Sequence, residues 1–260
     1  MHFPVRFRRA LRAVAVCAAA LATAGAAVFA VSWACIDAPL DAAERYPEGI
    51  VLRDREGAEL RATLGPGDVD CRPRRAAGRD EWISKAVVAS EDKRFWEHGG
   101  ADFRALARAI FQNVASGRRV SGASTITEQA VRLVEPHPRT LRWKWVEFVQ
   151  ALKTERARSK EWILAQYLDR APFGANYVGI EAAARGWFDK APEDLSLGEA
   201  ALLAGIVQAP TRFRPDRHMD RAVKRRDYVL DRMEALGWAT PEQVRAARAA
   251  PPAVDRKSVV

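Results

Sequence analysis

Two adjacent acids, Glu91 and Asp92, lie in a segment from Ser90 to His98 that also holds two basic and two aromatic residues. A plain surface helix rarely mixes charge and aromatic rings so closely. A carboxylate held beside apolar side chains can serve as a base, because its surroundings set how readily it takes a proton. Taken alone, the segment is more typical of a solvated charged turn in which His98 makes only a structural hydrogen bond.

A loop rich in Gly, Ser and Arg, residues 117–124, leads into a second cluster of polar residues. A helix that begins after Thr125 presents free backbone N–H groups, which suit an anion. The candidate functional residues of this cluster are Ser124, Thr125, Gln129, Arg132, Arg139, Lys144 and Glu147. Lys144 and Glu147 share one helix face, a spacing that also fits an ordinary surface pair worth about 0.3 kcal/mol.

The N-terminus combines a basic tail, residues 1–12, with an uncharged run over residues 13–36. As a helix the run reaches roughly 36 Å, which exceeds the ~30 Å hydrocarbon core of a bilayer. Arginines before the run and none directly after it predict a single membrane span, with the tail inside and the body outside. A cleaved signal peptide is the alternative, although the run is longer than the usual apolar region of one.

Residues 37–75 are predicted to form a stalk between the membrane and the body, because they are rich in Asp, Arg, Gly and Pro. A short hairpin is expected between Ile50 and Leu60. Cys35 and Cys71 could form a disulfide outside the membrane, but two unpaired thiols are the interpretation that we prefer. No cluster of His and Cys has the spacing of metal ligands.

The body, residues 76–250, is predicted to be all-α, because helical periodicity and capping residues recur and strand signals are almost absent. Ser196 opens a capping box before a helix that is apolar nearly all round, which should be buried at the centre. Helices are also expected over 103–114, 125–134, 140–156, 220–237, from 159 and from 240, with N-caps that include Asp102, Asp220 and Thr240. The buried stripe of the helix over 140–156 is predicted to be Leu141, Trp145, Phe148 and Leu152. Residues 251–260 form a tail.

Five segments of the body resemble, in order, the five motifs of the peptidoglycan glycosyltransferases, glycosyltransferase family 51. They are Glu91 to Asp102, Gly122 to Gln129, Lys144 to Glu147, Ile163 to Ala184 and Leu195 to Pro210. The similarity covers about residues 80–235, and five ordered motifs are far more specific than any one of them. The sequence around the motifs is similar to that of 1C-type penicillin-binding proteins.

This resemblance implies a lysozyme-like helical domain that polymerises lipid II into β-1,4 glycan strands, inverting the donor sugar as a lipid pyrophosphate leaves. The family's catalytic base falls on Glu91 and its second essential acid on Glu147. Its phosphate-binding cations fall on Arg132, Arg139 and Lys144, where they would stabilise the charge that develops on the leaving group. The other residues expected to bind substrate are Asp92, Ser124, Thr125 and Gln129.

The resemblance also implies a cofactor, partners and a location. A divalent cation, Mg or Mn, is expected to act at the pyrophosphate, with no ligands assigned and no organic cofactor. Expected partners are lipid II, the nascent glycan strand, the cytoplasmic membrane and other cell-wall synthesis proteins. The catalytic domain should lie on the periplasmic or extracellular face. The net charge of +9 suits phosphate or acidic lipid, and a location outside the membrane weakens nucleic acid as a partner.

The sequence departs from the family's pattern at Glu128, Trp143, Asp169 and Asp189, where the family has Gln or Met, Arg, Asn and Gly. Arg142 precedes Trp143, but on a helix its side chain would point about 100° away. Glu128 is expected to cap back on Thr125 and so to point away from the site.

Two other functions fit the same residues. A membrane-anchored glycan hydrolase or lytic transglycosylase would use a Glu as general acid, but it needs no cations to hold a pyrophosphate. A catalytically weak scaffold that binds lipid II is favoured by the departures. Ser90 to Lys93 matches the Ser-x-x-Lys of penicillin-binding transpeptidases in form only, since its partner motifs are absent. We therefore expect a monofunctional protein or a shortened 1C-type chain.

Overall fold

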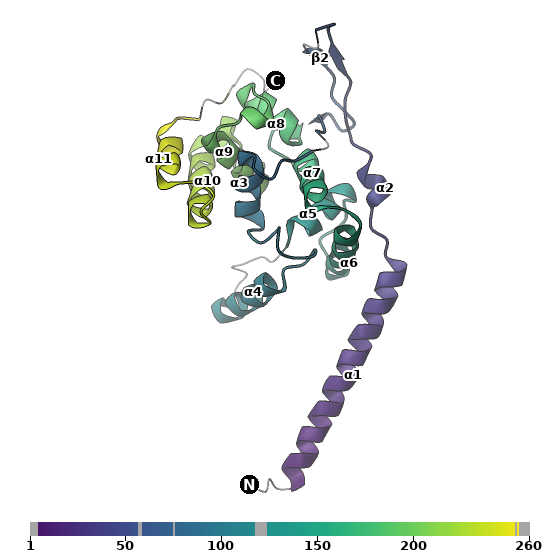
Figure 1. Ribbon diagram of the computed structural model, residues 1–260. Helices are drawn as coiled ribbons and strands as arrows, with labels where there is room; N and C mark the ends of the chain where they lie inside the picture. The colour runs from purple at the N-terminus through teal and green to yellow at the C-terminus, as the bar shows by residue number, and fades with distance from the viewer. Residues whose placement is uncertain (1–4, 57–58, 75, 118–123, 253, 255–260) are drawn as a thin grey trace.

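The computed structural model describes residues 5–56, 59–74, 76–117, 124–252 and 254, and it is mainly helical, as the sequence predicts. One long helix, α1, extends away from a helical body, and a β-hairpin projects from the segment between them (Figure 1). The helices are α1 (Val5–Cys35), α2 (Leu40–Ala43), α3 (Trp82–Glu91), α4 (Phe103–Ser116), α5 (Ile126–Val134), α6 (Leu141–Ala157), α7 (Lys160–Arg170), α8 (Ile180–Phe188), α9 (Leu197–Val207), α10 (Pro215–Ala235) and α11 (Pro241–Ala249). The strands are β1 (Val51–Arg53), β2 (Glu59–Ala62), β3 (Asp70–Cys71) and β4 (Tyr177–Val178).

Local capping explains where most helices of the body begin. A side-chain oxygen at the N-cap accepts a hydrogen bond from a backbone N–H in the first turn, which would otherwise lack a partner. The capping residues are Asp102, Thr125, Thr140, Ser159, Ser196 and Thr240. Reciprocal capping boxes form at the starts of α9 and α11. The predicted starts of these six helices are confirmed.

The predicted start of α10 is wrong. The helix begins at Pro215 rather than after Asp220, and its backbone leaves helical geometry at His218. Proline at the first helical position has a suitable φ and needs no N–H partner there, so it can start a helix without a side-chain cap. The kink at His218 separates this first turn from the rest of α10.

The centre of the body is α9, which packs against α10 and α3. Its residues from Ala200 to Ile206 are buried, which confirms the prediction of a central apolar helix. The helix α3, which packs against α9, ends at Glu91, and this packing fixes the position of the first motif. Packing against α9 therefore holds the end of α3 in place.

The predicted buried stripe of α6 is wrong. Leu141 is 91% exposed and Trp145 is 38% exposed. The buried residues of α6 are instead Glu147, Val149, Gln150, Ala151 and Thr154. Trp145 lies against α1, where its indole N–H donates to Ser32 Oγ at 2.9 Å. One side of α6 thus meets the end of the apolar helix, and a largely polar side turns inward.

The segment α1 is long and apolar enough to cross a membrane over Ala13–Cys35, with a mean hydropathy of 2.3. This agrees with the predicted span over residues 13–36. Near its end, Gln150 on α6 donates to the backbone oxygen of Asp37 at 3.1 Å. The body is therefore held directly against the exit of this helix.

The stalk contains the predicted hairpin, in which β1 and β2 pair antiparallel. It is also joined to the body by contacts that the sequence did not indicate, since β3 pairs in parallel with β4. Arg170 on α7 donates to the backbone oxygens of Ala43 and Arg45 at 2.6 and 2.9 Å. Asp169 Oδ1 accepts a hydrogen bond from the Arg74 N–H at 3.1 Å, so this departure from the family's pattern has a structural role.

The cysteines are not paired. Cys35 is exposed and Cys71 is buried, and both are free thiols. Burial raises the pKa of Cys71 to about 11, so the thiol stays protonated at neutral pH. This agrees with the preferred interpretation of unpaired thiols.

Asp189 should be a site where glycine increases stability. It ends α8 with φ of 53°, a left-handed conformation in which a Cβ atom is unfavourable. We expect Asp189→Gly to raise the free energy of unfolding by about 0.5 kcal/mol. Thermal unfolding of both proteins checks this, with Asp220→Gly inside α10 as a control that should lose about 0.5–1 kcal/mol. An unchanged or lower stability of Asp189→Gly would contradict it.

Candidate active site

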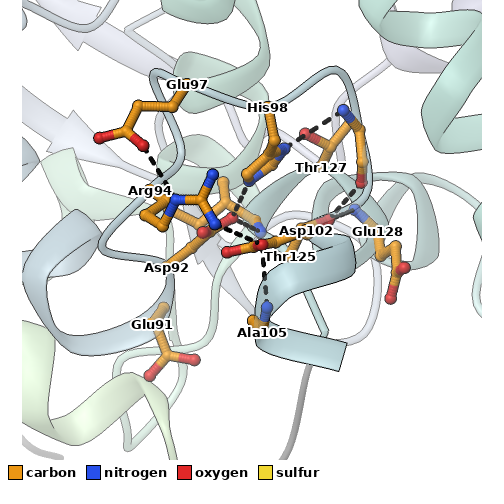
Figure 2. Close-up of polar contacts among 12 residues, drawn as sticks. Glu91, Asp92, Arg94, Glu97, His98, Asp102, Ala105, Thr125, Thr127 and Glu128 are labelled. Carbon is orange, nitrogen blue, oxygen red and sulfur yellow. Dashed lines mark hydrogen bonds and ion pairs between the residues drawn. The ribbon is translucent and has the colours of Figure 1, made fainter. Parts of the chain in front are cut away.

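Glu91 lies at the C-terminal end of α3, and its carboxylate points away from its neighbour Asp92 (Figure 2). Gln129 Nε2 donates to Glu91 Oε2 at 3.2 Å. Burial raises the pKa of Glu91, while the hydrogen bond from Gln129 and the positive charges of Arg225 and Arg232 lower it. Glu91 as a residue is half-buried. A reachable carboxyl group with a raised pKa is suited to proton transfer.

Asp92 and Thr125 have structural contacts. Asp92 Oδ2 lies 2.9 Å from His98 Nε2 and accepts a hydrogen bond from the Ile126 N–H at 3.0 Å. Thr125 Oγ1 donates to the Gly100 carbonyl at 2.7 Å. Figure 2 shows this network joining the first motif to the start of α5. The contacts hold the segment after Glu91 in place, and the binding of substrate by Asp92 and Thr125 stays a prediction.

The helix α5 links the two acids expected to be essential. Gln129, which contacts Glu91, is followed one turn later by Arg132, whose NH1 atom lies 3.4 Å from Glu147 Oε1. The Glu147 side chain is 3% exposed, and Lys144 Nζ lies 2.6 Å from its Oε2 atom. Lys144 also donates to Ser124 Oγ at 2.8 Å. Six of the predicted site residues are therefore joined through contacts along α5 and α6.

The prediction for the Glu128 side chain is wrong. Thr125 Oγ1 accepts a hydrogen bond from the Glu128 N–H at 3.1 Å, but the Glu128 carboxylate does not return to Thr125. Its Oε2 atom lies 3.2 Å from Lys144 Nζ. Burial raises the pKa of Glu128, and the charge of Lys144 lowers it. A carboxylate gains more from an ammonium ion than from a neutral N–H, so Glu128 turns into the site.

Arg139, the remaining predicted cation, is exposed in the segment before α6, as is Arg142 at the start of α6. The loop over residues 117–124 falls largely on residues 118–123, which lie outside the described residues. The role of this loop at the site therefore stays a prediction, as does that of Arg139.

Sequence reasoning missed two cations on α10. Arg225 and Arg232 lie near enough to Glu91 to lower its pKa, and Arg232 Nε donates to the Ala89 carbonyl at 2.6 Å. They are two helix turns apart and so share a face. That spacing was the only sequence signal, and it is common on charged helices. Packing of α10 against α3 brings both cations near Glu91.

Within the ranges that the structure describes, no three His, Cys, Asp or Glu side chains are grouped so that they could hold a metal ion. Glu128 and Glu147 do converge, but on Lys144 Nζ, at 3.2 and 2.6 Å. An ammonium ion thus takes the place that a cation would occupy between these carboxylates.

Comparison with known proteins identifies the family of this chain. The sequence model of the transglycosylase family matches residues 73–234. Penicillin-binding protein 1C of Escherichia coli K12 is 45% identical over 167 residues, which are 64% of this chain and 22% of that protein. Penicillin-binding protein 1A of Aquifex aeolicus is 44% identical over 164 residues, 63% of this chain and 23% of that protein. The crystal structure of penicillin-binding protein 1A from Haemophilus influenzae aligns with 81% of this chain and 22% of its own, at a TM-score of 0.47 and 19% identity.

The chain therefore belongs to the transglycosylase family, because the family model spans most of its length. It covers less than a quarter of the length of the curated relatives that it matches. The matched region includes every helix that carries a predicted site residue. Membership of this family and the apolar helix α1 together indicate a membrane-anchored protein.

Proposed function

We propose that this chain is a peptidoglycan glycosyltransferase that polymerises lipid II into β-1,4 glycan strands. The observation that carries the proposal is that α5 connects a candidate base with a cluster of cations. At one end Gln129 contacts the carboxyl group of Glu91, whose pKa is raised by burial. One turn further, Arg132 and Lys144 converge around Glu147, where an anionic leaving group would be stabilised.

Glu91 is proposed to be the base. The sugar 4-hydroxyl of the acceptor is a weak nucleophile, and a carboxylate within hydrogen-bond reach takes its proton as the oxygen attacks C1 of the donor. The new C–O bond forms on the face opposite the breaking bond to the lipid pyrophosphate. One displacement therefore inverts an α-linked donor into a β-linked product. Gln129 helps to hold the carboxylate in position, since its amide donates a hydrogen bond to one of the two oxygens.

The pyrophosphate is proposed to leave toward Lys144 and Arg132, whose charges are balanced in the free protein by Glu147 and Glu128. Ser124 adds a hydroxyl beside Lys144. Because Glu128 and Glu147 converge on Lys144, we propose that any Mg²⁺ or Mn²⁺ arrives with the pyrophosphate oxygens of the substrate. Such an ion would neutralise charge on the phosphates.

The body is proposed to lie on the periplasmic or extracellular face of the membrane, where lipid II is used. The arginines before residue 13 support this orientation. The helix α4 exposes apolar side chains, which supports contact with lipid. Its exposed apolar residues are Phe103, Leu106, Phe111 and Val114.

The test is polymerisation of labelled lipid II by the purified chain in detergent, with Mg²⁺ and with a chelator. Glycan chains that lengthen with time would support the transferase. Binding of lipid II without chains would favour a scaffold whose site is degenerate. Release of sugar from finished glycan would favour the hydrolase or lytic transglycosylase, for which the cations around Glu147 have no evident use.

The pH dependence of the rate should follow the ionisation of Glu91. A base must be unprotonated, so kcat/KM is expected to fall as pH decreases through the raised pKa of Glu91. Gln129→Leu removes a hydrogen bond that lowers this pKa, so the acid limb should move to higher pH. Rates across pH for the wild type and the variant measure this. Gln112→Leu, an exposed position on α4, is the control, and equal acid limbs for all three proteins would refute the assignment.

A further inference from the structure

The end of the membrane helix α1 packs against α6 through aromatic rings. Phe29 and Trp33 of α1 have ring centroids 5.8 Å apart, and the Trp145 ring of α6 lies 6.3 Å from that of Phe29. The hydrogen bond from Trp145 to Ser32 adds to these contacts. Figure 1 shows α6 beside the upper end of α1. The contacts therefore define which part of α6 lies next to the membrane helix.

Trp33 lies at the depth where a bilayer changes from hydrocarbon to headgroups. The apolar span Ala13–Cys35 has 23 residues. As a helix this span is about 34 Å long, slightly more than the ~30 Å hydrocarbon core. Trp33 is in the last turn of α1, and tryptophan is enriched at this interface of membranes. Side chains of α6 that contact the Trp33 ring therefore lie at the level of the lipid phosphates.

Two cations of α6 lie over the Trp33 ring. The guanidinium carbon of Arg156 is 4.8 Å from the ring centroid, and Lys153 Nζ is 5.4 Å from it. The indole face attracts both cations. The two residues are three positions apart and so share one side of α6, where like charges repel each other. The arrangement concentrates positive charge at one point beside the membrane helix.

Nearby acidic side chains balance this charge only in part. Lys153 Nζ lies 3.5 Å from Asp37 Oδ1, but the Asp37 side chain is 95% exposed, so this pair contributes little. Glu155 pairs instead with Lys160, at 2.7 Å. Within the described ranges, no carboxylate lies within ion-pair distance of Arg156, which is exposed. An anion between Lys153 and Arg156 would therefore offset their repulsion.

We propose that Trp33, Lys153 and Arg156 form a binding site for the phosphate of an anionic phospholipid. The guanidinium and ammonium groups donate hydrogen bonds to the phosphate oxygens. The acyl chains lie along α1, whose side chains Val28 and Val31 are 57% and 62% exposed. The bound lipid holds α6 at the membrane surface. This inference does not depend on the reaction that the chain catalyses, and its test needs no measurement of activity.

Lipid binding to the purified full chain in a neutral detergent tests the proposal. Native mass spectrometry gives the ratio of bound to free protein with phosphatidylglycerol or with phosphatidylcholine, whose headgroup carries a compensating cation. We expect tighter binding of phosphatidylglycerol. Lys153→Gln/Arg156→Gln should weaken that binding about fivefold for each cation removed, and should leave phosphatidylcholine unaffected. An unchanged affinity for phosphatidylglycerol in this variant would overturn the proposal.

The matched control is Arg221→Gln/Lys224→Gln, which removes two exposed cations with the same spacing from α10. Figure 1 shows α10 on the side of the body away from α1. The two double variants lower the net charge of +9 equally. The control should bind phosphatidylglycerol like the wild type. An equal loss in both double variants would show that total charge attracts the lipid, and it would refute a site at Trp33.

Variants of Trp33 and a soluble anion complete the test. Trp33→Phe keeps an aromatic face and should bind phosphatidylglycerol like the wild type, whereas Trp33→Leu should bind it more weakly. Equal binding by both variants would contradict the role of the ring. Inorganic phosphate at millimolar concentration should not displace the lipid, and displacement would exclude a lipid as the preferred ligand. Thermal unfolding of each variant without added lipid verifies that weaker binding does not reflect a loss of fold.

Discussion

Glu91→Gln is expected to abolish most polymerisation of lipid II, with a loss of about 10²–10⁴ in kcat. The amide cannot take the proton of the attacking hydroxyl, but it has nearly the same size and still can contact Gln129. Binding of lipid II should therefore be retained. The free energy of unfolding should stay the same or rise slightly, because burial already disfavours the charged form of Glu91. Single-turnover rates, lipid II binding and thermal unfolding of both proteins measure these effects.

The matched control is Glu97→Gln in the same segment. Glu97 pairs with Arg94 at 2.9 Å, but its side chain is 63% exposed, so the pair contributes little. This variant should polymerise at close to the wild-type rate. Loss of activity in both variants would show that the segment tolerates no change of charge, and full activity in Glu91→Gln would exclude Glu91 as the base.

Lys144→Ala is expected to reduce both activity and stability. Lys144 Nζ lies 2.6 Å from Glu147 and 3.2 Å from Glu128, so its removal leaves two neighbouring carboxylates without the cation between them. We expect a loss of about 10²–10³ in kcat/KM, typical of removing one group that stabilises developing charge. The loss of stability should be about 1–3 kcal/mol, below that for a fully buried pair because Lys144 is 40% exposed.

The stability loss in Lys144→Ala should depend on pH. Lys144 lowers the pKa of Glu128, so its removal raises that pKa further above the unfolded value. The folded variant then binds more protons than the unfolded chain between the two values, and its stability falls as pH rises through them. Thermal unfolding at several pH values should therefore show the smallest loss at the acid end.

Two further variants serve as controls for Lys144→Ala. Glu128→Gln added to it removes one of the two uncompensated carboxylates and should recover part of the stability. Arg245→Ala breaks another i, i+3 ion pair, with Glu242 at 2.8 Å, but both side chains are about 70% exposed. Its effect should be below about 0.5 kcal/mol. A comparable loss in Arg245→Ala, or no recovery with Glu128→Gln, would argue against the ion cluster as the cause.

The sequence by itself determined most helices of the body and where six of them start. Capping at Thr125, Ser196 and Thr240 involves residues three positions apart, so the pattern is visible locally. The same is true of the apolar run that forms α1 and of the hairpin of β1 and β2. The order of the motifs indicated Glu91 and Glu147, because five local patterns in sequence are specific together.

Only the tertiary structure decided which side of each helix faces the site. The apolar spacing of α6 predicted a buried Trp145, yet this residue contacts α1 and the buried position belongs to Glu147. Periodicity shows that a helix has two sides, but it does not distinguish a core from another apolar partner. Likewise, the Glu128 carboxylate contacts Lys144 on α6 instead of the local partner that its cap offers.

Contacts between segments far apart in the chain account for the rest. Arg225 reaches the neighbourhood of Glu91 because α10 packs on α3. Such positions depend on burial and on charge partners from several helices, so no short window of sequence contains them. Local sequence patterns thus predicted most of the helices and indicated the two acids. Packing between helices determined which charged side chains surround those acids.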